Sequence, residues 1–392
     1  MPIDPMLPNQ IPLISINDIA VLADRAMGML DEIRANMLAP VREKVAPVFS
    51  AVKVAELCNM DKSQFSRRLA RGDLPPGKVI NAARREFSLA ETRTWVKASG
   101  VPYKRGNAPA ATIAIGNFKG GVSKTTTAMT LAQGLSLRGY RVLLIDTDPQ
   151  GSLTTFFGLL PDSDIQPEET IQMLFLGEQA SVRYAIRSTY WDGIDLIPAS
   201  PALFAAEFAL PAQQVRNPSF EFWNVLNRGL TDVKDEYDLI IIDTPPSLSY
   251  VTINAFLASD GLIVPLPPYG LDFASSAQFW SLFSDLTSSL QEKGRIDKSY
   301  SFIHVLLSKV DMTDATTSIV RSWITATYAE KVLPVEIPKT SVASVSSAQF
   351  GTVYDISRYA GSQKTYQRAR EAYDRVARLV EESIVSYWSR NA

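Results

Sequence analysis

Residues 119–126 read Lys-Gly-Gly-Val-Ser-Lys-Thr-Thr, and they lie between the apolar run of residues 112–118 and a helical pattern at residues 128–135. A strand, a glycine pair with Lys-Thr-Thr and then a helix is typical of a phosphate-binding loop. The backbone N–H groups of such a loop form an anion-binding concavity, and the helix N-terminus adds about half a positive charge. The stretch therefore predicts a site for a polyphosphate.

The loop departs twice from the usual pattern G-x-x-x-x-G-K-[ST]. Phe118 stands where the first glycine belongs, and Ser123 precedes the lysine. The loop has instead a second lysine, Lys119, five residues before Lys124. Two ammonium groups would repel each other if both approached one phosphate from the same side. We therefore expect Lys119 to be free to cross an interface; a lysine held by a structural ion pair is the alternative.

Three further positions can complete a magnesium and hydrolysis site. Thr125 follows Lys124 and can offer its hydroxyl to Mg²⁺, and the apolar strand at residues 238–243 ends in Asp243, which suits the Walker B role. Asp146 and Asp148 are two apart at the end of another strand, so they share a face. One can serve the metal while the other orients a water for in-line attack. For Asp146, a strand-end cap is the alternative.

Strand and helix signals alternate from the loop to about residue 350. Several strands are continuous apolar runs, which is expected where helices cover both faces of a parallel sheet. We therefore expect residues 107–392 to form an α/β domain of the P-loop NTPase type, with a mostly parallel twisted sheet flanked by helices. The expected strands are residues 112–118, 141–147, 193–198, 239–243, 261–265, 302–308 and 332–337.

Composition excludes several classes of protein. The chain has 392 residues, with 46% apolar and 20% charged side chains, as in an ordinary globular protein of two or three domains. No apolar run approaches the ~20 residues of a membrane span, and no signal peptide is evident, so we expect a cytoplasmic protein. One cysteine and one histidine exclude an intramolecular disulfide and a His/Cys metal cluster.

The N-terminal part differs in charge from the rest. Residues 1–107 contain 16 Lys/Arg and 11 Asp/Glu, a charge of +5, so the total of −2 leaves −7 on residues 108–392. Residues 53–105 alone carry 12 basic and 5 acidic residues, or +7. Such a block indicates contact with a polyanion, although a solvated basic face is an equal alternative. Before it, residues 16–38 form an amphipathic pattern, capped by Ser15 or Asn17, and we expect residues 1–45 to hold a helix that pairs with a second copy or packs on a neighbouring domain.

Residues 46–106 have the pattern of a winged helix–turn–helix. A short helix at residues 53–58, a turn and a second helix at residues 62–71 are followed by a wing at residues 74–87 and a capping box that opens a third helix at Ser88. On the second helix Phe65 and Leu69 face inward. A purely structural helix pair is the alternative. The side chains expected to contact DNA are Ser63, Gln64, Arg67, Arg68 and Arg71 on the helix, with Arg84 and Arg85 on the wing.

The three motifs that begin at Lys119, Asp146 and Asp243 resemble those of the deviant Walker A ATPases of the ParA/MinD group. With the N-terminal helix and helix–turn–helix, the whole chain resembles the larger plasmid-type ParA proteins. The resemblance implies ATP hydrolysis with Mg²⁺ and a homodimer that encloses two nucleotides. Lys119 would reach the partner's phosphates, Lys124 its own, and Asp148 would position the attacking water.

The resemblance also implies DNA segregation. The ATP dimer would bind DNA non-specifically on the bacterial nucleoid, a ParB-type partner would stimulate hydrolysis, and operator binding would repress the partition genes. The alternatives are a dedicated transcription regulator that uses ATP only as a dimerisation switch, and a MinD-like membrane-cycling ATPase, which the N-terminal DNA module disfavours.

The site residues fall into groups. We expect nucleotide contacts from the loop and, near the adenine, from residues 338–339, where Lys339 replaces the arginine usual in the family. The C-terminal helix, residues 363–388, is rich in arginine and could add to a DNA surface with Arg358, although a solvated helix face is the alternative. The nucleotide set is Lys119, Gly120, Gly121, Val122, Ser123, Lys124, Thr125, Thr126, Pro338 and Lys339; the metal set is Thr125, Asp146 and Asp243; the catalytic set is Lys119, Lys124 and Asp148.

Overall fold

The computed structural model describes residues 14–36, 44–81, 84–340, 351–356 and 361–392. The chain divides into two units, residues 1–44 and residues 45–392. Arg358 lies outside the described residues. Among the residues described, no helix is both long and apolar enough to cross a membrane.

The described part of the first unit contains one helix, α1 (Ile16–Asn36). Ser15 begins it, because its hydroxyl accepts a hydrogen bond from the Asp18 N–H while the Asp18 carboxylate accepts one from the Ser15 N–H. The expected helix is therefore confirmed, with Ser15 as its cap. Its apolar side chains Ile19, Leu22 and Met29 are each more than half exposed, so the described residues of this unit do not cover the apolar stripe by themselves.

Residues 45–99 contain the helices and the hairpin that the sequence predicts. Asp61 and Ser88 each open a helix with a capping box, the second of which is the expected one, and Gly72 ends a helix at φ 72°. The core is aromatic: the Phe65 and Trp95 ring centroids are 4.5 Å apart, and Phe87 packs edge-on against both. The helices are α2 (Ala51–Leu57), α3 (Lys62–Arg71) and α4 (Leu89–Ala98), and a small sheet has the order β1 (Phe49–Ser50), β3 (Arg84–Phe87), β2 (Lys78–Asn81).

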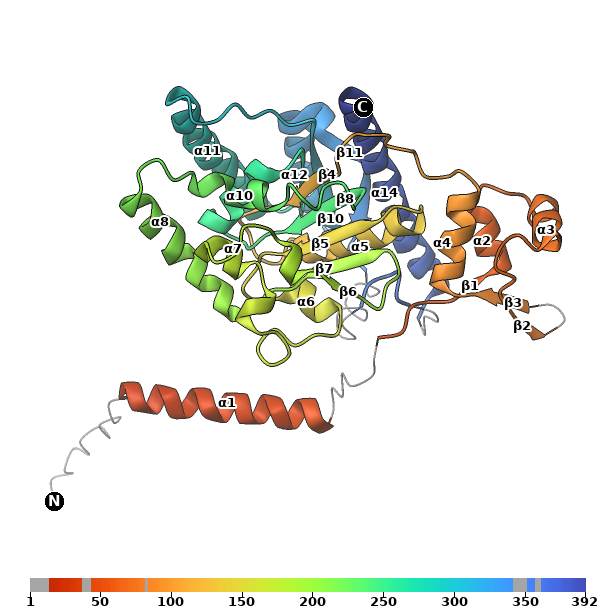
Figure 1. Cartoon of the computed structure of the whole chain (residues 1–392), viewed down its shortest axis with the longest axis horizontal. Coiled ribbons are helices and arrows are strands. Elements are labelled where there is room, and N and C mark those ends of the chain that lie inside the picture. The colour runs from red at the N-terminus through yellow and green to blue at the C-terminus, as the bar shows by residue number, and fades with distance from the viewer. Residues whose placement is uncertain (1–13, 37–43, 82–83, 341–350, 357–360) are drawn as a thin grey trace, which may run out of the picture. The chain divides into compact units, whose positions relative to one another are not determined.

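An eight-stranded sheet forms the centre of residues 100–392, with the order β11-β10-β9-β4-β8-β5-β7-β6 (Figure 1). All neighbours are parallel except β6 and β7. The seven expected strands are all present, and β6 is an additional two-residue strand at one edge. At the other edge β11 contains Pro334 and Pro338. The strands are β4 (Ala111–Ile115), β5 (Val142–Asp146), β6 (Arg187–Ser188), β7 (Ile194–Ile197), β8 (Leu239–Asp243), β9 (Gly261–Leu266), β10 (Phe302–Val310) and β11 (Val332–Pro338).

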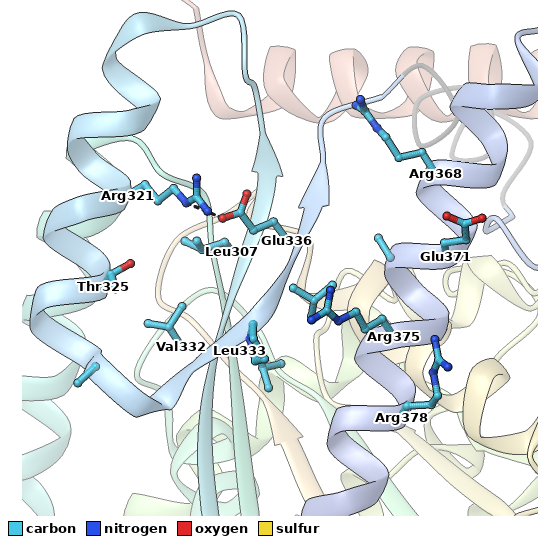
Figure 2. A pocket seen from close by; sticks show the side chains of 14 residues that line it. Leu307, Arg321, Thr325, Val332, Leu333, Glu336, Arg368, Glu371, Arg375 and Arg378 are labelled. Carbon is cyan, nitrogen blue, oxygen red and sulfur yellow. Dashed lines mark ion pairs between the residues drawn. The ribbon is translucent and has the colours of Figure 1, made fainter.

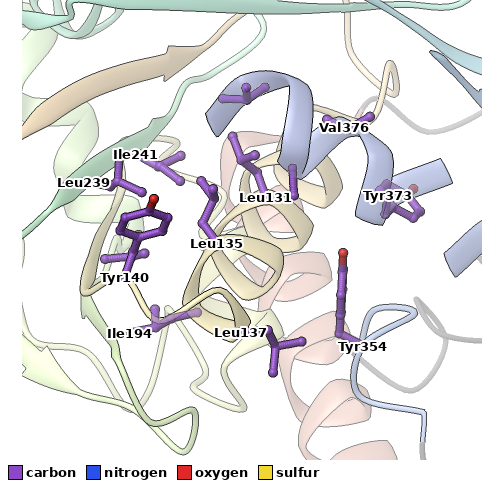
Figure 3. Close-up of a cluster of buried hydrophobic side chains, with 14 of the residues drawn as sticks. Leu131, Leu135, Leu137, Tyr140, Ile194, Leu239, Ile241, Tyr354, Tyr373 and Val376 are labelled. Atoms are coloured by element: carbon purple, nitrogen blue, oxygen red, sulfur yellow. The ribbon is translucent and has the colours of Figure 1, made fainter. Parts of the chain in front are cut away.

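Helices cover both faces of this sheet, which explains its continuous apolar strands. Alternate side chains of β8 enter two different cores: Leu239 and Ile241 pack with α5 and α14 (Figure 3), whereas Ile240 and Ile242 pack with α10 and α11. The helices are α5 (Lys124–Leu137), α6 (Ser152–Phe156), α7 (Gln172–Leu176), α8 (Ala206–Arg216), α9 (Val225–Gly229), α10 (Tyr250–Ala258), α11 (Gly270–Glu292), α12 (Ala315–Tyr328) and α14 (Gln363–Asn391). Short 3₁₀ turns occur at Pro167–Glu169, Arg183–Ala185, Pro201–Ala205, Phe222–Asn224 and Ala329–Lys331.

Candidate active site

The loop of residues 116–123 connects β4 to the N-terminus of α5, at the carboxyl ends of the parallel strands. Gly121 and Ser123 have left-handed φ values of 74° and 77°, which turn the backbone into a tight curve. Ser123 precedes α5 without a side-chain hydrogen bond to the helix. The Ser123 side chain therefore does not cap the first N–H groups of α5. These N–H groups remain suited to binding an anion.

Lys124 is the first residue of α5 and is buried. Its Nζ donates to the backbone oxygen of Lys119, at 3.0 Å, across the loop. Burial lowers the pKa of Lys124, and the nearby Asp243 and Asp148 partly oppose this effect. The ammonium group therefore lies within the curve of the loop, beside two carboxylates.

Asp243 ends β8 and is fully buried opposite Asp146 in the sheet register. Neither of its carboxylate oxygens accepts a hydrogen bond of normal geometry in the described residues. Burial raises the pKa of Asp243 well above its usual value, and Asp146 raises it further, while the adjacent Thr125 hydroxyl and Lys124 lower it. A buried carboxylate without a donor costs free energy unless a cation is bound. The Thr125 and Asp243 oxygens thus fit Mg²⁺, a hard cation that prefers oxygen ligands.

Asp146 differs from Asp243 in having its donors in place. Its carboxylate accepts hydrogen bonds from the Thr154 N–H at 2.8 Å, the Thr154 hydroxyl at 2.7 Å and the Asp148 N–H at 3.1 Å. Burial is the main cause that raises the pKa of Asp146 to about 7. The strand-end cap is therefore present, and a direct contact of Asp146 with metal stays a prediction. Asp148, which Asp146 holds in place, is half-buried.

A cavity of about 720 Å³ joins the loop to the end of β11. Lys124, Thr125 and Asp148 line it at the loop, and Pro338 and Lys339 line it at the end of β11; their contact with a nucleotide stays a prediction. Lys339 also forms an ion pair with Asp311, with a 3.2 Å separation between Nζ and the carboxylate. The other lining residues are Gly120, Gly121, Ser123, Thr126, Ser152, Thr155, Phe156, Pro246, Lys309, Ile337, Thr340 and Tyr373.

Two of these residues reach the cavity from distant parts of the chain. Lys309 has a left-handed φ of 51° at the end of β10, and its Nζ donates to the Gly121 backbone oxygen. The run Ser-Lys-Val-Asp after a predicted strand is the only sequence signal for it. Tyr373 projects from α14, and no sequence pattern separates it from the other core residues of that helix.

Lys119 does not line the cavity. Its Nζ lies 3.9 Å from a carboxylate oxygen of Asp272, in the first turn of α11. Asp272 is buried, which raises its pKa, while Lys119 and Lys309 oppose that effect. The two lysines of the loop are thus separated, with Lys124 inside the cavity and Lys119 paired outside it.

Several of the residues expected to contact DNA already have partners within the protein. Ser63 and Arg67 are exposed on α3, but the Arg68 guanidinium donates to the Ala98 oxygen at the end of α4, and the Gln64 side chain accepts from the Asp61 N–H within the cap. With Arg71, the α3 residues Gln64, Arg67 and Arg68 line a cavity beside the C-terminal end of α4, whereas the wing residues line another with Phe65. On the wing, Arg85 donates to the Pro76 oxygen and Arg84 pairs with Glu86.

Comparisons with known proteins agree with this geometry. Residues 110–296 match a family model described as an AAA domain. A putative replication protein A of Rhizobium rhizogenes is 30% identical over 383 residues, which cover 94% of each chain. The chromosome partitioning protein ParA of Caulobacter vibrioides is 32% identical over 273 residues, 68% of this chain and 95% of that protein. This chain belongs to the ParA family of partition ATPases.

Solved structures extend the likeness of this ParA-family chain to its fold. A partition protein with 21% identity superposes with a TM-score of 0.67, covering 95% of this chain and 98% of that one. A cobyrinic acid a,c-diamide synthase of Mycobacterium smegmatis, solved with ADP and magnesium, has 28% identity and a TM-score of 0.53 over 69% of this chain and 94% of its own. The expected P-loop fold with its mostly parallel sheet is therefore confirmed.

Proposed function

We propose that this chain hydrolyses ATP, dimerises when it binds ATP, and segregates plasmid or chromosomal DNA in the bacterial cytoplasm together with a ParB-type partner. The observation that carries the proposal is the separation of the two loop lysines, because an NTPase that acts within one chain needs only Lys124 on the loop. We propose that Lys119 exchanges Asp272 for the partner's nucleotide. The bound dimer would associate with the nucleoid.

ATP and Mg²⁺ are the ligands that the cavity fits. The uncapped N-terminus of α5 and Lys124 would hold the phosphates, and Thr125 and Asp243 would hold Mg²⁺ with help from Asp146 through water. Bound Mg²⁺ supplies neutralisation of the phosphate charge. Asp148, on the cavity wall and fixed by Asp146, would orient the attacking water. Residues 338–339 and Lys309 would lie toward the base and ribose.

Mixing of two inactive variants tests whether Lys119 acts across the dimer. In a mixed dimer of Lys119→Ala and Asp148→Ala chains, one site keeps its own Asp148 and receives Lys119 from the partner. An equal mixture should therefore recover about one quarter of the active sites of the unmodified symmetric dimer. If Lys119 acted within its own chain, no site would hold both residues, and the mixture would stay inactive.

We propose that α3 binds the operator and that the protein thereby represses its own genes. Ser63 and Arg67, exposed on the first turns of α3, would make the base and phosphate contacts, and Arg71 would assist. Arg67→Ala should weaken binding to a duplex that carries the DNA upstream of the protein's own coding sequence, by roughly tenfold for one arginine contact. Arg228→Ala, on α9, is the control, and a gel shift at fixed salt is the measurement. Equal binding by both variants would remove α3 from the operator contact.

Non-specific DNA binding fits a groove beside β11 (Figure 2). Arg368, Arg375 and Arg378 project from α14, and Arg321 on α12 pairs with Glu336 across a cavity of about 820 Å³. Arg370 does not contribute, because it stacks on the Tyr354 ring at 4.0 Å. Replacing Arg375 and Arg378 by alanine should reduce the salt dependence of binding to a random duplex by nearly two released counterions. An unchanged salt slope would show that DNA does not lie in the groove.

The uncovered stripe of α1 supports pairing with a second copy of this helix. Ile19, Leu22 and Met29 would then be buried between the two copies. Sedimentation without nucleotide tests this, because the full chain should form dimers and a chain that lacks residues 1–44 should not. If the full chain and the shortened chain both formed dimers, or if neither did, α1 would have a different role.

A transcription regulator that uses ATP only as a switch is the alternative to a partition motor. A ParB-type partner and non-specific DNA should together stimulate ATP turnover by the full chain. A regulator of this kind would show no stimulation. The measurement is phosphate release with the partner, with DNA and with both.

A further inference from the structure

Arg93, on α4, joins the helices α2, α3 and α4 to the sheet domain. Its side chain is 5% exposed, and its guanidinium donates to the Ser136 oxygen at 3.0 Å, to the Tyr140 oxygen at 2.8 Å and to the Asp192 carboxylate. Gly193, at φ 84°, lies against the group, since a Cβ there would come within 2.0 Å of the Arg93 Cζ. A planar fork with three acceptors in three segments fixes both position and orientation.

Two of the three partners of Arg93 lie at the far ends of elements that carry the active site. Ser136 is in the last turn of α5, whose first residue is Lys124. Tyr140 comes just before β5, whose other end carries Asp146 and leads to Asp148. A helix and a strand transmit displacement along their length because their backbone hydrogen bonds resist deformation. A shift of α5 or β5 at the loop would therefore reach Arg93.

The connection around Arg93 leaves little freedom. The Tyr140 hydroxyl accepts from the Tyr103 N–H at 2.9 Å and donates to Glu381 of α14 at 2.7 Å. Trp388 of α14 packs against both tyrosine rings, with centroids 6.2 Å from Tyr103 and 5.6 Å from Tyr140. The segment between α4 and β4, although without helix or strand, is thus anchored at its middle.

On its other side, α4 is fixed to α3. Trp95 of α4 packs on Phe65 of α3 with ring centroids 4.5 Å apart, and Arg68 of α3 donates to the Ala98 oxygen at 3.0 Å. A displacement of α4 would therefore carry α3 with it as a rigid body.

We propose that Arg93 couples the nucleotide site to α3, so that the nucleotide bound at Lys124 sets the orientation of the DNA-reading helix. The inference rests on the proposed operator contact of α3 for its biological effect, but the coupling itself does not require DNA. Arg93 is a positioning residue that acts through α5 and β5, and it touches neither nucleotide nor DNA.

The test measures the distance between α3 and α11 by pulsed electron resonance of two spin labels. Ala70→Cys and Ser284→Cys, both exposed, carry the labels in a Cys58→Ser full-length chain. Without Arg93 substitution, the distance distribution should be narrow and its mean should shift between Mg-ADP and a Mg-bound non-hydrolysable ATP analogue. With Arg93→Lys, which keeps the charge but loses the fork, the distribution should broaden and the shift should be lost. Arg141→Lys is the matched control, since Arg141 pairs with Asp195 and does not bond to α4.

Asp192→Asn provides a milder second variant in case Arg93→Lys does not fold, because it removes only the carboxylate and should reduce the shift without abolishing it. The proposal would be overturned if both variants kept a narrow distance distribution whose mean shifts between the two nucleotides. It would also be overturned if the mean distance did not change between the two nucleotides in the chain with Arg93 intact. The proposed function fails separately: if no variant binds upstream DNA, the operator assignment falls while the distance result stands. If DNA is bound, Arg93→Lys should bind it equally with and without nucleotide.

Discussion

The phosphate-binding loop and the Arg93 joint both bury charge, but they treat it differently. At the joint, the guanidinium meets two carbonyls and a carboxylate. At the loop, Asp243 has no hydrogen bond of normal geometry among the described residues, Ser123 does not cap α5, and Lys124 donates to the loop's own backbone. Since burying a charge without partners is costly, the fold tolerates it at the loop only because ligands complete the site. The fully paired Arg93 holds two parts of the chain together, whereas the incompletely paired Asp243 and the uncapped α5 mark the place where ligands bind.

The strongest test of this contrast is Lys119→Ala. Its ion pair with Asp272 at 3.9 Å has a half-exposed lysine and contributes little to stability. Turnover should fall by ~10³-fold, the lower end of what a transferred cationic finger contributes. ADP affinity, measured by calorimetry, should stay unchanged. Unchanged turnover would make Lys119 a structural residue.

Lys124→Ala should affect binding itself. The loop would lose its buried cation, at a cost of about 3 kcal/mol for a charged hydrogen bond, or ~100-fold in nucleotide affinity. Calorimetric titration with Mg-ADP measures the loss, and Lys119→Ala serves as its control on the same loop. Normal affinity in the Lys124 variant would contradict the assignment of this lysine.

Thr154→Val tests the paired part of the site. The Thr154 hydroxyl donates to Asp146 and accepts from the Ala199 N–H at 2.9 Å. Valine has the same shape and leaves both groups without this partner, so the free energy of unfolding should fall by about 2 kcal/mol. Denaturant unfolding without nucleotide measures it. A neutral result would mean that water replaces the hydroxyl.

Asp243→Asn tests the unpaired part, and its expected effect is the smallest and has the opposite sign. Removing a buried carboxyl group that lacks donors should raise the free energy of unfolding by about 1 kcal/mol at neutral pH without Mg²⁺. Because the pKa of Asp243 is raised in the folded state, the native carboxyl keeps its proton at pH values where the unfolded chain has lost it. The free energy of unfolding of the unmodified chain therefore falls as pH rises from about 4 through the pKa that Asp243 has in the folded state.

The gain from Asp243→Asn should accordingly grow with pH over that window and vanish at its acid end. Asp195→Asn is a matched control, because this carboxylate already has partners in Arg141 and Tyr237. A destabilised Asp243→Asn chain would show that the carboxylate has a protein partner after all.

The sequence predicts the sheet and the loop between β4 and α5 well because both depend on local order. The seven strands, the loop and Asp243 follow from continuous apolar runs that end in polar residues, and such runs specify a buried parallel sheet. Ser88 and Glu91 form a capping box that their spacing in the sequence predicts. Prediction fails where a side chain serves a distant partner: Arg68 is periodic with the outer face of α3, but its partner, the Ala98 oxygen, is 30 residues away. Tertiary packing alone likewise brings Tyr373 to the cavity and Asp272 to Lys119 of the loop.

The two edges of the large sheet have a consequence under the proposed function, in which chains gather on DNA. Chains held side by side on one duplex would reach local concentrations at which open strands could join into a continuous sheet. β11 carries Pro334 and Pro338, which have no N–H to offer a neighbouring strand, and β6 at the other edge has two residues. Crowded molecules would therefore contact one another only through side chains. Such contacts can break each time the nucleotide is hydrolysed.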